Sequence, residues 1–208
     1  MSVPQQIAGR VELGGKAETI LAAAERAFLA SGFGAVTMDA IAREAGVSKA
    51  TVYAHFAGKE ALFGAFVARV SERRFQGFSA EALDPADIAA SLTTIARRFL
   101  DLVLSPEGIA LNRIIVGEVT RFPVLGEVFW AAGPERQRAQ IEAFLRRCAE
   151  IGSLAVPDPR LAAEQFIALA RGEIHLRSLL RLEDPGDPAA LTAAVASTVA
   201  TFLRAFAR

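Results

Sequence analysis

The sequence from Thr37 to Lys59, TMDAIAREAGVSKATVYAHFAGK, contains two short helical segments joined at Gly46. Thr37 is a typical N-cap residue for the first segment, and Ser48 is one for the second. Gly46 suits the tight turn between them, because glycine readily adopts the left-handed conformation that ends a helix. Two short helices joined in this way match the helix-turn-helix motif, whose second helix enters the major groove of DNA.

The second segment has distinct inner and outer faces at 100° per residue. Val52 and Phe56 share one face and, with the preceding Val47, are expected to anchor the helix. Ala50 and Ala54 lie opposite, where a methyl group allows close approach and can touch a thymine methyl. The hydrogen-bonding side chains that flank this small-residue surface are Ser48, Lys49, Thr51, Tyr53 and His55. These side chains are suited to base edges and phosphates, so the outer face predicts a groove reader.

Two further positions lie at helix N-termini. Thr37 can bind a phosphate with its hydroxyl and amide, and Lys59 opens the following helix, whose free N–H groups attract anions. We therefore expect Thr37 and Lys59 to contact the DNA backbone.

The whole chain of 208 residues reads as all-α. Apolar residues recur with a helical period, and no stretch alternates as a half-buried strand would. The pattern predicts three short helices followed by six or so longer ones. The expected ranges are 16–31, 37–45, 48–56, 59–76, 85–104, 106–121, 123–152 (kinked or split at Gly133-Pro134), 159–182 and 188–208.

Composition narrows the class of protein. The 23 basic and 23 acidic residues cancel, and 52% of the residues are hydrophobic. These values exclude a disordered polyelectrolyte and a protein that coats nucleic acid by charge alone. We find no apolar run near the roughly 18–20 residues of a membrane span and no apolar signal-peptide centre, so we expect a cytoplasmic protein without a membrane partner.

Catalytic and metal-binding patterns are missing from the sequence. Cys148 is the single cysteine, and the two histidines, His55 and His175, are 120 residues apart. This predicts no internal disulfide, metal or cofactor. Residues 61–208 contain no phosphate-binding loop, HExxH or GxSxG motif, so we do not expect an enzyme.

The N-terminal motifs coincide along one continuous stretch. Ser31-Gly32-Phe33 ends a helix, Gly46-Val47-Ser48 leads into Thr51-x-Tyr53-x-His55-Phe56, and Gly58-Lys59-Glu60-Ala61-Leu62 follows. Over residues 16–65 the chain closely resembles the TetR family of bacterial transcriptional regulators. The resemblance implies that residues 1–60 form an arm and DNA-binding domain, and that residues 61–208 bind an effector and dimerise. The DNA contacts it implies are Thr37, Ser48, Lys49, Thr51, Tyr53, His55 and Lys59.

The later segment from Arg113 to Pro123, continuing through Phe129-Trp130 to Arg136, resembles the AefR-like type of TetR C-terminal domain. That resemblance implies an apolar effector cavity among the central helices. The residues expected to line it are Phe99, Val103, Ile114, Glu118, Phe129 and Trp130, with His175 as a further candidate. Aromatic residues at helical spacing are also common as plain core, and His175 could equally be a packed or interfacial histidine.

The last two helices carry more apolar residues than one buried stripe needs. The first set is Phe166, Ile167, Leu169, Ile174, Leu179 and Leu180, and the second is Val195, Val199, Phe202, Leu203 and Phe206. We expect a homodimer in which these helices form a four-helix bundle, as the resemblance also implies. Packing within a single chain is the alternative.

These features favour a dimeric regulator that binds double-stranded operator DNA and is released by a small apolar effector. Residues 16–60 hold five basic and five acidic side chains, so binding should depend on paired half-sites more than on charge. A helical carrier of an apolar molecule, with a non-functional DNA-binding head, is an alternative from another class. Activation in place of repression also remains open.

Overall fold

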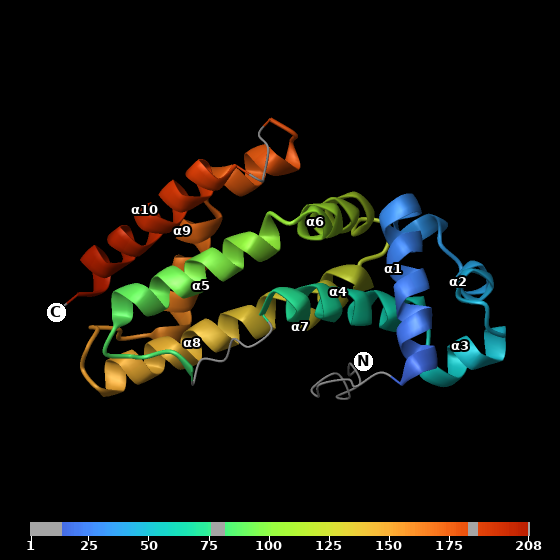
Figure 1. The fold of residues 1–208 in the computed structure, drawn as a ribbon, viewed down its shortest axis with the longest axis horizontal. Helices are drawn as coiled ribbons and strands as arrows, with labels where there is room; N and C mark the ends of the chain where they lie inside the picture. Colours follow the sequence, from blue (N-terminus) through green and yellow to red (C-terminus); the bar gives the residue numbers. More distant parts are fainter. Residues whose placement is uncertain (1–13, 76–81, 183–186, 208) are drawn as a thin grey trace. The chain divides into compact units, whose positions relative to one another are not determined.

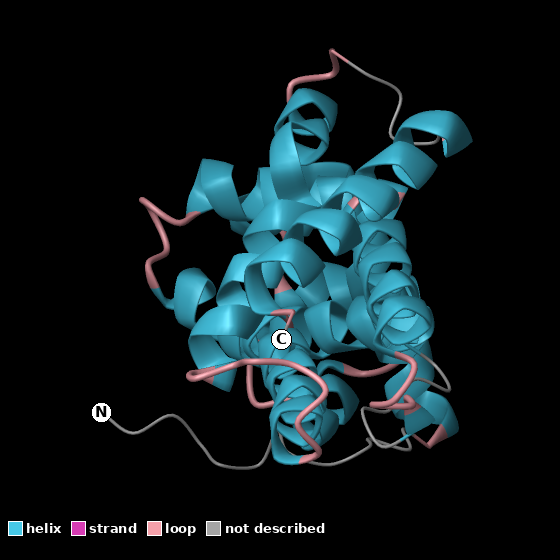
Figure 2. Cartoon of the chain, turned by 90° about the vertical axis from the view of Figure 1, so that its left-hand side faces the viewer, coloured by secondary structure: helices cyan, strands magenta, loops and turns pink. Residues whose placement is uncertain are grey.

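The computed structural model describes residues 14–75, 82–182 and 187–207, and throughout these residues the chain is helical without a strand (Figure 2). The all-α prediction is therefore confirmed. The helices, labelled in Figure 1, are α1 (Gly15–Ala35), α2 (Met38–Ala45), α3 (Lys49–His55), α4 (Lys59–Phe75), α5 (Ile88–Val103), α6 (Pro106–Glu118), α7 (Val124–Ala132), α8 (Pro134–Glu150), α9 (Pro159–Leu179) and α10 (Pro188–Phe206).

Side-chain caps begin α2 and α3 at the predicted residues, and α9 and α10 also begin with a side-chain cap. The Thr37 hydroxyl accepts the Ala40 N–H in α2, and the Ser48 hydroxyl accepts the Thr51 N–H in α3. The carboxylates of Asp158 and Asp187 do the same for α9 and α10, each followed by proline at the first helical position. A cap of this kind satisfies a backbone donor that the helix itself cannot.

The structure moves one expected helix start and shows that the segment expected to be kinked or split is split. The helix expected from Pro85 begins at Ile88, because Asp87 is the residue that caps it, by accepting the Ala90 N–H. The segment 123–152 forms two helices, with Gly133 between α7 and α8 at φ −125° and ψ −83°. Steric conflict with Pro134 disfavours a helical conformation for the preceding residue, which explains the break.

Internal glycines also interrupt α1 and α9. Gly32 has φ 74° and ψ 174°, and Gly172 has φ 47° and ψ −159°. Both conformations are strained for any residue with a side chain. The face of α9 that follows Gly172 therefore cannot be extrapolated from the face that precedes it.

The chain packs into two compact units. The first combines the chain up to Arg69 with residues 114–133, and the second combines residues 70–113 with residues 134–208. These units are defined by packing within the chain. The division expected after residue 60 is one between DNA binding and effector binding, so it stays a prediction.

An aromatic cluster forms the core of the first unit. The rings of Phe28 and Phe33 in α1 pack on those of Phe63 and Phe66 in α4, with centroid separations of 5.4–6.3 Å. All four side chains are fully buried. Stacked and edge-to-face geometries of this kind add to the gain from removing the rings from water.

Beside this cluster Arg69 of α4 binds two glutamates of α1. Its Nη1 donates to Glu18 Oε1 at 2.6 Å, and its Nη2 donates to Glu25 Oε2. The Arg69 and Glu25 side chains are nearly buried, whereas Glu18 is half-exposed. Removing one partner would leave the other charge buried without compensation.

Replacing Arg69 by methionine should therefore lower the free energy of unfolding by about 3 kcal/mol, as measured by urea denaturation. The double variant Arg69→Met/Glu25→Leu should recover most of this loss, because it removes both buried charges. Arg97→Ala, which breaks an exposed pair with Asp101, is the control and should change stability by less than about 1 kcal/mol. Equal losses in the single and double variants would contradict the charge argument.

The second unit is built from α5, α8, α9 and α10, which pack against one another. Its most deeply buried side chains include Phe99, Phe144, Phe166 and Phe202, and Cys148 is buried as well. The rings of Phe166 and Phe202 meet edge to face at 5.1 Å, joining α9 to α10.

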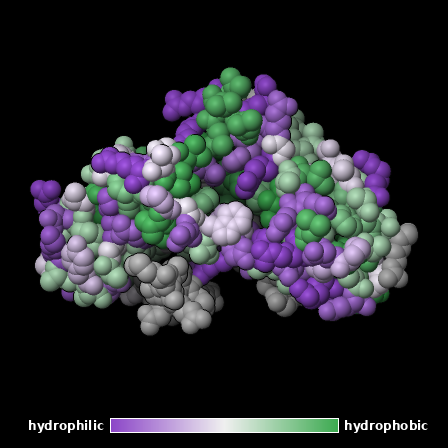
Figure 3. Space-filling view, turned by 180° about the vertical axis from the view of Figure 1, so that it is seen from behind, coloured by the Kyte–Doolittle hydropathy of each residue, from purple (hydrophilic) through white to green (hydrophobic). Residues whose placement is uncertain are grey.

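This packing corrects part of the expected subunit seam. Phe166, Val195, Val199 and Phe202, which we assigned to an interface, are buried within the chain. Other apolar residues, in α9 and just after its end, stay exposed, and Figure 3 shows hydrophobic side chains at the surface of the molecule. We call four of these residues the α9 leucines: Leu169, Leu176, Leu180 and Leu182.

By length and composition alone, α10 is apolar enough to cross a membrane, and only a minority of its residues are buried in the chain. The expectation that no apolar stretch approaches that length is therefore wrong for this helix. Its exposed positions include Ala189, Ala193, Ala196 and Ala200, so its outer surface is smooth. A single such helix is weak evidence of a membrane segment.

Candidate functional site

The recognition helix α3 presents the outer face that the sequence predicts. Val52 and Phe56 are buried, whereas Lys49, Ala50, Tyr53, Ala54 and His55 are exposed. Gly46 turns the chain between α2 and α3 at φ 67° and ψ 30°, the left-handed conformation. The helix is thus fixed by its inner face and leaves a methyl surface edged by polar groups.

The two capping hydroxyls lie at the start of the helices that carry this face. The Ser48 Oγ is 3.1 Å from the Thr51 N and 2.8 Å from the Thr51 Oγ1. The Thr37 Oγ1 is 3.2 Å from the Ala40 N, and Thr37 is exposed. Each cap uses the hydroxyl oxygen as an acceptor, so the Thr37 hydroxyl proton remains available for a phosphate or a base. The Ser48 and Thr51 hydroxyls hydrogen-bond to each other, which uses one of their two protons and leaves the other available.

Two exposed cations of the first unit, Lys49 in α3 and Arg26 in α1, are paired with carboxylates. Lys49 Nζ lies 2.8 Å from Asp39 Oδ1, and this hydrogen bond, with the charge of Asp39, raises the pKa of Lys49. Arg26 Nε lies 2.8 Å from Glu44 Oε1. Both pairs are exposed, so water screens them and a phosphate could replace the carboxylate.

The structure places Lys59 in an environment that the sequence did not predict. Its ammonium donates to the carbonyls of Phe33 at 2.9 Å and Val36 at 2.8 Å, and it lies 4.2 Å from the centroid of the Phe33 ring. Burial lowers the pKa of Lys59. These contacts tie the start of α4 to the end of α1, and its expected contact with DNA phosphate stays a prediction.

Glu118, the last residue of α6, and Phe122, which follows this helix, reach the same junction within the first unit. Glu118 Oε1 accepts the Gly34 N–H at 3.0 Å, and the Phe122 ring packs edge to face on Phe33 at 5.3 Å. A Cβ at Gly34 would lie 3.0 Å from the Glu118 carboxylate, so a side chain there would displace it.

The seven residues expected to bind an effector belong to different units. Phe99, Val103 and His175 are buried in the second unit. The others belong to the first unit: Ile114 and Phe129 are half-buried, Glu118 binds Gly34, and Trp130 is 56% exposed.

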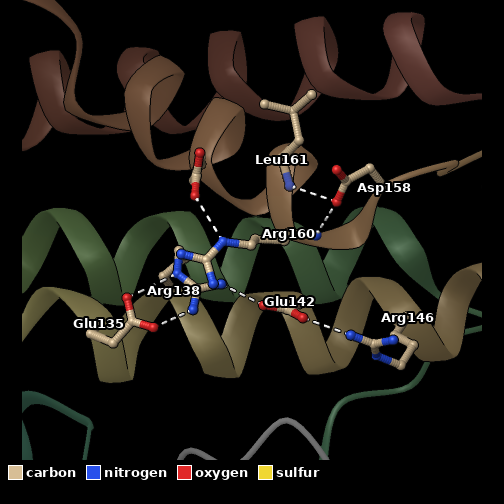
Figure 4. A network of polar contacts seen from close by, with 8 residues as sticks. Glu135, Arg138, Glu142, Arg146, Asp158, Arg160 and Leu161 are labelled. Atoms are coloured by element: carbon tan, nitrogen blue, oxygen red, sulfur yellow. Dashed lines mark hydrogen bonds and ion pairs between the residues drawn. The ribbon is translucent and has the colours of Figure 1, made fainter.

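Arginine–glutamate pairs run along α8 and into α9 (Figure 4). Arg138 binds Glu135 and Glu142, and Arg146 binds the second oxygen of Glu142 at 2.6 Å. Further pairs on α9 are Arg160 with Glu164 and Arg177 with Glu173, both at 3.4 Å. A carboxylate therefore neutralises each of these arginines.

Around the break in α9 the polar groups lack such partners. His175 is 5% exposed and Ser178 is 2% exposed, yet the His175 Nε2 and the Ser178 Oγ form no hydrogen bond with any residue that the structure describes. Each unsatisfied buried polar atom costs about 1–3 kcal/mol. Burial and the charge of Arg171 lower the pKa of His175 to about 4, so the imidazole is neutral at pH 7.

Arginines from two helices border these atoms. Arg113 of α6 donates to the carbonyls of Ser178 and Leu179 at 3.0 and 3.1 Å and so caps the end of α9. The Arg171 guanidinium carbon lies 6.0 Å from the Phe99 ring centroid. Among the described residues, no carboxylate pairs with Arg171.

Comparison with known proteins places both parts of the chain. Residues 20–66 match the family of bacterial regulatory proteins of the tetR type, and residues 90–208 match the C-terminal domain of AefR-like transcriptional repressors. The second match alone covers more than half of the chain. The chain belongs to the TetR family.

Similar proteins agree with this assignment. The structure of the flavonoid-responsive regulator FrrA is 35% identical, with a TM-score of 0.77, and the match covers 94% of this chain and 98% of that one. A TetR-family regulator from Mesorhizobium loti is 26% identical, with a TM-score of 0.78 and coverage of 94% and 100%. The HTH-type transcriptional regulator YdeS of Bacillus subtilis is 29% identical over 181 residues, 86% of either chain. This TetR-family protein is thus a DNA-binding transcriptional regulator of a non-enzymatic family.

Sequence reasoning missed the inward role of Lys59 and the group formed by Arg171 and Ser178. Lys59 gave no signal, because its acceptors are 23 and 26 residues earlier in the chain. For the second group a signal existed: a glycine inside an apolar helix, here Gly172, often marks a break with a functional reason.

Replacing Lys59 by methionine should lower the free energy of unfolding of this TetR-family regulator by about 2 kcal/mol, because two buried carbonyls lose a charged donor. Urea denaturation would measure this, with the exposed Lys16→Met as a control that leaves stability unchanged. Unchanged stability of Lys59→Met, with weaker and less salt-dependent DNA binding, would instead assign Lys59 to a phosphate.

Proposed function

We propose that this chain is a homodimeric cytoplasmic repressor that binds operator DNA through α3 and is released by a small, largely apolar effector. The observation that carries the DNA-binding role is the exposed methyl surface of Ala50 and Ala54, held outward by the buried Val52 and Phe56. An alanine surface of this kind lets the helix backbone approach the base edges closely.

The proposed interface contains contacts to the bases, contacts to base edges or phosphates, and contacts to the DNA backbone. Ala50 and Thr51 lie at the bases, and Ser48 and Lys49 reach base edges or phosphates from the start of α3. The backbone contacts come from Thr37, Tyr53 and His55, of which Tyr53 is 47% exposed. Lys49 exchanges Asp39 for a phosphate on binding, so its contribution is smaller than that of an unpaired lysine.

Ala50→Glu should weaken binding to the DNA upstream of this protein's own gene by roughly 100-fold, because like charges placed together across an interface cost several kcal/mol. Fluorescence anisotropy at two salt concentrations, with a shuffled fragment for comparison, would measure specific and non-specific binding separately.

The matched control is Ala89→Glu, an exposed alanine at the start of α5 in the second unit, which should bind like the wild type. Equal binding of Ala50→Glu and wild type to the specific fragment would remove α3 from the interface. Failure of the wild type to prefer any genomic fragment in a selection would remove the regulator function itself.

An effector releases the operator only if it binds more tightly to a conformation that holds DNA poorly. Phe99 and Val103 are the buried candidates for its apolar contacts in the second unit. The similar regulator FrrA is named flavonoid-responsive, which supports an aromatic small molecule as the effector. A role of Ile114, Glu118, Phe129 and Trp130 in effector binding stays a prediction.

Dimerisation through α9 and α10 would cover the apolar surface that a single chain leaves exposed. The α9 leucines include Leu176 and Leu180, which are 56% and 61% exposed. On α10 the exposed alanines recur at helical spacing, so a partner helix could approach closely. A dimer interface also accounts for the apolar composition of α10 without a membrane.

The double variant Leu176→Glu/Leu180→Glu should shift the protein from dimer to monomer in sedimentation velocity, because two buried charges would face their copies in the partner. Its operator affinity should fall at least tenfold, since one half-site is then lost. Ile151→Glu, an exposed apolar position at the end of α8, serves as the control. A dimeric double variant with an unchanged helical spectrum would exclude this interface.

A further inference from the structure

We propose that Arg171, His175 and Ser178 form the polar end of the effector site, and that the effector carries a carboxylate next to an apolar or aromatic body. This inference rests on the proposed function for the existence of an effector and adds its chemical class. Three side chains on one short stretch of α9 carry it, together with Phe99 of α5.

The first observation is the pair of unsatisfied atoms. His175 and Ser178 lie three residues apart after the break at Gly172 and so share one face of the helix. A buried serine in a helix ordinarily donates to the carbonyl four residues earlier, as Thr198 does to Ala194 in α10. Within the part of the chain that the structure describes, the Ser178 hydroxyl makes no such bond, and both it and the imidazole Nε2 are buried polar atoms without a partner.

The second observation is the unneutralised charge of Arg171. Arg138, Arg146, Arg160 and Arg177 on α8 and α9 each bind a glutamate (Figure 4 shows the first three). Arg171 is exposed to solvent, and among the described residues no carboxylate binds its guanidinium, whose carbon lies 6.0 Å from the Phe99 ring centroid. Partial burial lowers the pKa of Arg171. A cation in this setting favours an anionic ligand.

The third observation is the sign of the surrounding charge. The charge that acts on His175 is that of Arg171, and Arg113 adds a second guanidinium at the end of α9. An organic cation would be repelled here, and a purely apolar ligand would leave the polar atoms unsatisfied. A carboxylate can accept from Arg171 and from the Ser178 hydroxyl, while the Phe99 ring contacts the attached body.

Isothermal titration calorimetry on the full-length protein tests the headgroup. The probes are benzoate, 2-naphthoate and decanoate, each compared with its methyl ester, which keeps the body and removes the charge. We expect at least one acid to bind about tenfold more tightly than its ester, as a charge-assisted contact requires. Arg171→Gln should remove this preference, and Arg160→Gln, which breaks an exposed pair on the same helix, should keep it.

Two variants separate a ligand-binding role from a structural one. Ser178→Ala and His175→Phe should weaken binding of the preferred acid several-fold and leave the melting temperature unchanged or raised, because each removes an unsatisfied buried atom. A clear drop in melting temperature with unchanged acid binding would assign these atoms to a buried water and overturn the proposal. Equal affinity for every acid and its ester, or a preference that survives Arg171→Gln, would overturn it as well.

Titration of operator DNA in the absence of acids and esters distinguishes failure of the carboxylate site from failure of the proposed regulator function. Arg171→Gln should bind operator DNA as the wild type does, since Arg171 belongs neither to the DNA contacts nor to the α9 leucines of the proposed dimer interface. Operator binding without a preference for any acid would overturn the proposed carboxylate site and leave the proposed regulator function in place. Acid binding without operator binding would overturn the proposed regulator function and leave the carboxylate site in place.

Discussion

The packing of α1 against α4 is the constraint on which the DNA-binding head depends. Helices of eight and seven residues, the lengths of α2 and α3, are not stable alone in water. They persist because Phe28 and Phe33 stack on Phe63 and Phe66, which gives α2 and α3 a fixed surface to pack on. Since the anchoring residues Val52 and Phe56 lie on the inner side, the exposed outer residues of α3 are not needed for its packing.

Helix caps and the buried face of a helix could be predicted from the sequence, whereas contacts between residues far apart in the chain could not. Thr37 and Ser48 were predictable as caps because the cap and its donor are three residues apart. Burial of Val52 followed from helical periodicity in the same way. Lys59 shows the limit: the start of a helix favours a phosphate contact by every local rule, yet its ammonium lies on carbonyls of a helix far back in the chain.

The second unit shows a different limit of periodicity. Both faces of α9 are apolar, so the pattern could not tell Phe166, which is buried in the chain, from Leu176, which is exposed. The break at Gly172 is a second reason, because it reorients all later side chains of α9. Helical spacing in the sequence does not reveal the size of this reorientation. An apolar surplus was therefore predictable, whereas its division between core and surface was not.

Charge pairing in the head bears on how such a regulator can be controlled. Lys49 and Arg26 are paired with Asp39 and Glu44, so a phosphate that binds either cation must replace an existing ion pair. Under the proposed function the affinity of each head is then modest, and the proposed dimer adds affinity because its second head binds at a high effective concentration. In that dimer a change in the separation of the heads would remove this added affinity, because the heads would no longer match the half-site spacing. The proposed release by an effector would then need less binding free energy than release of a strongly basic head.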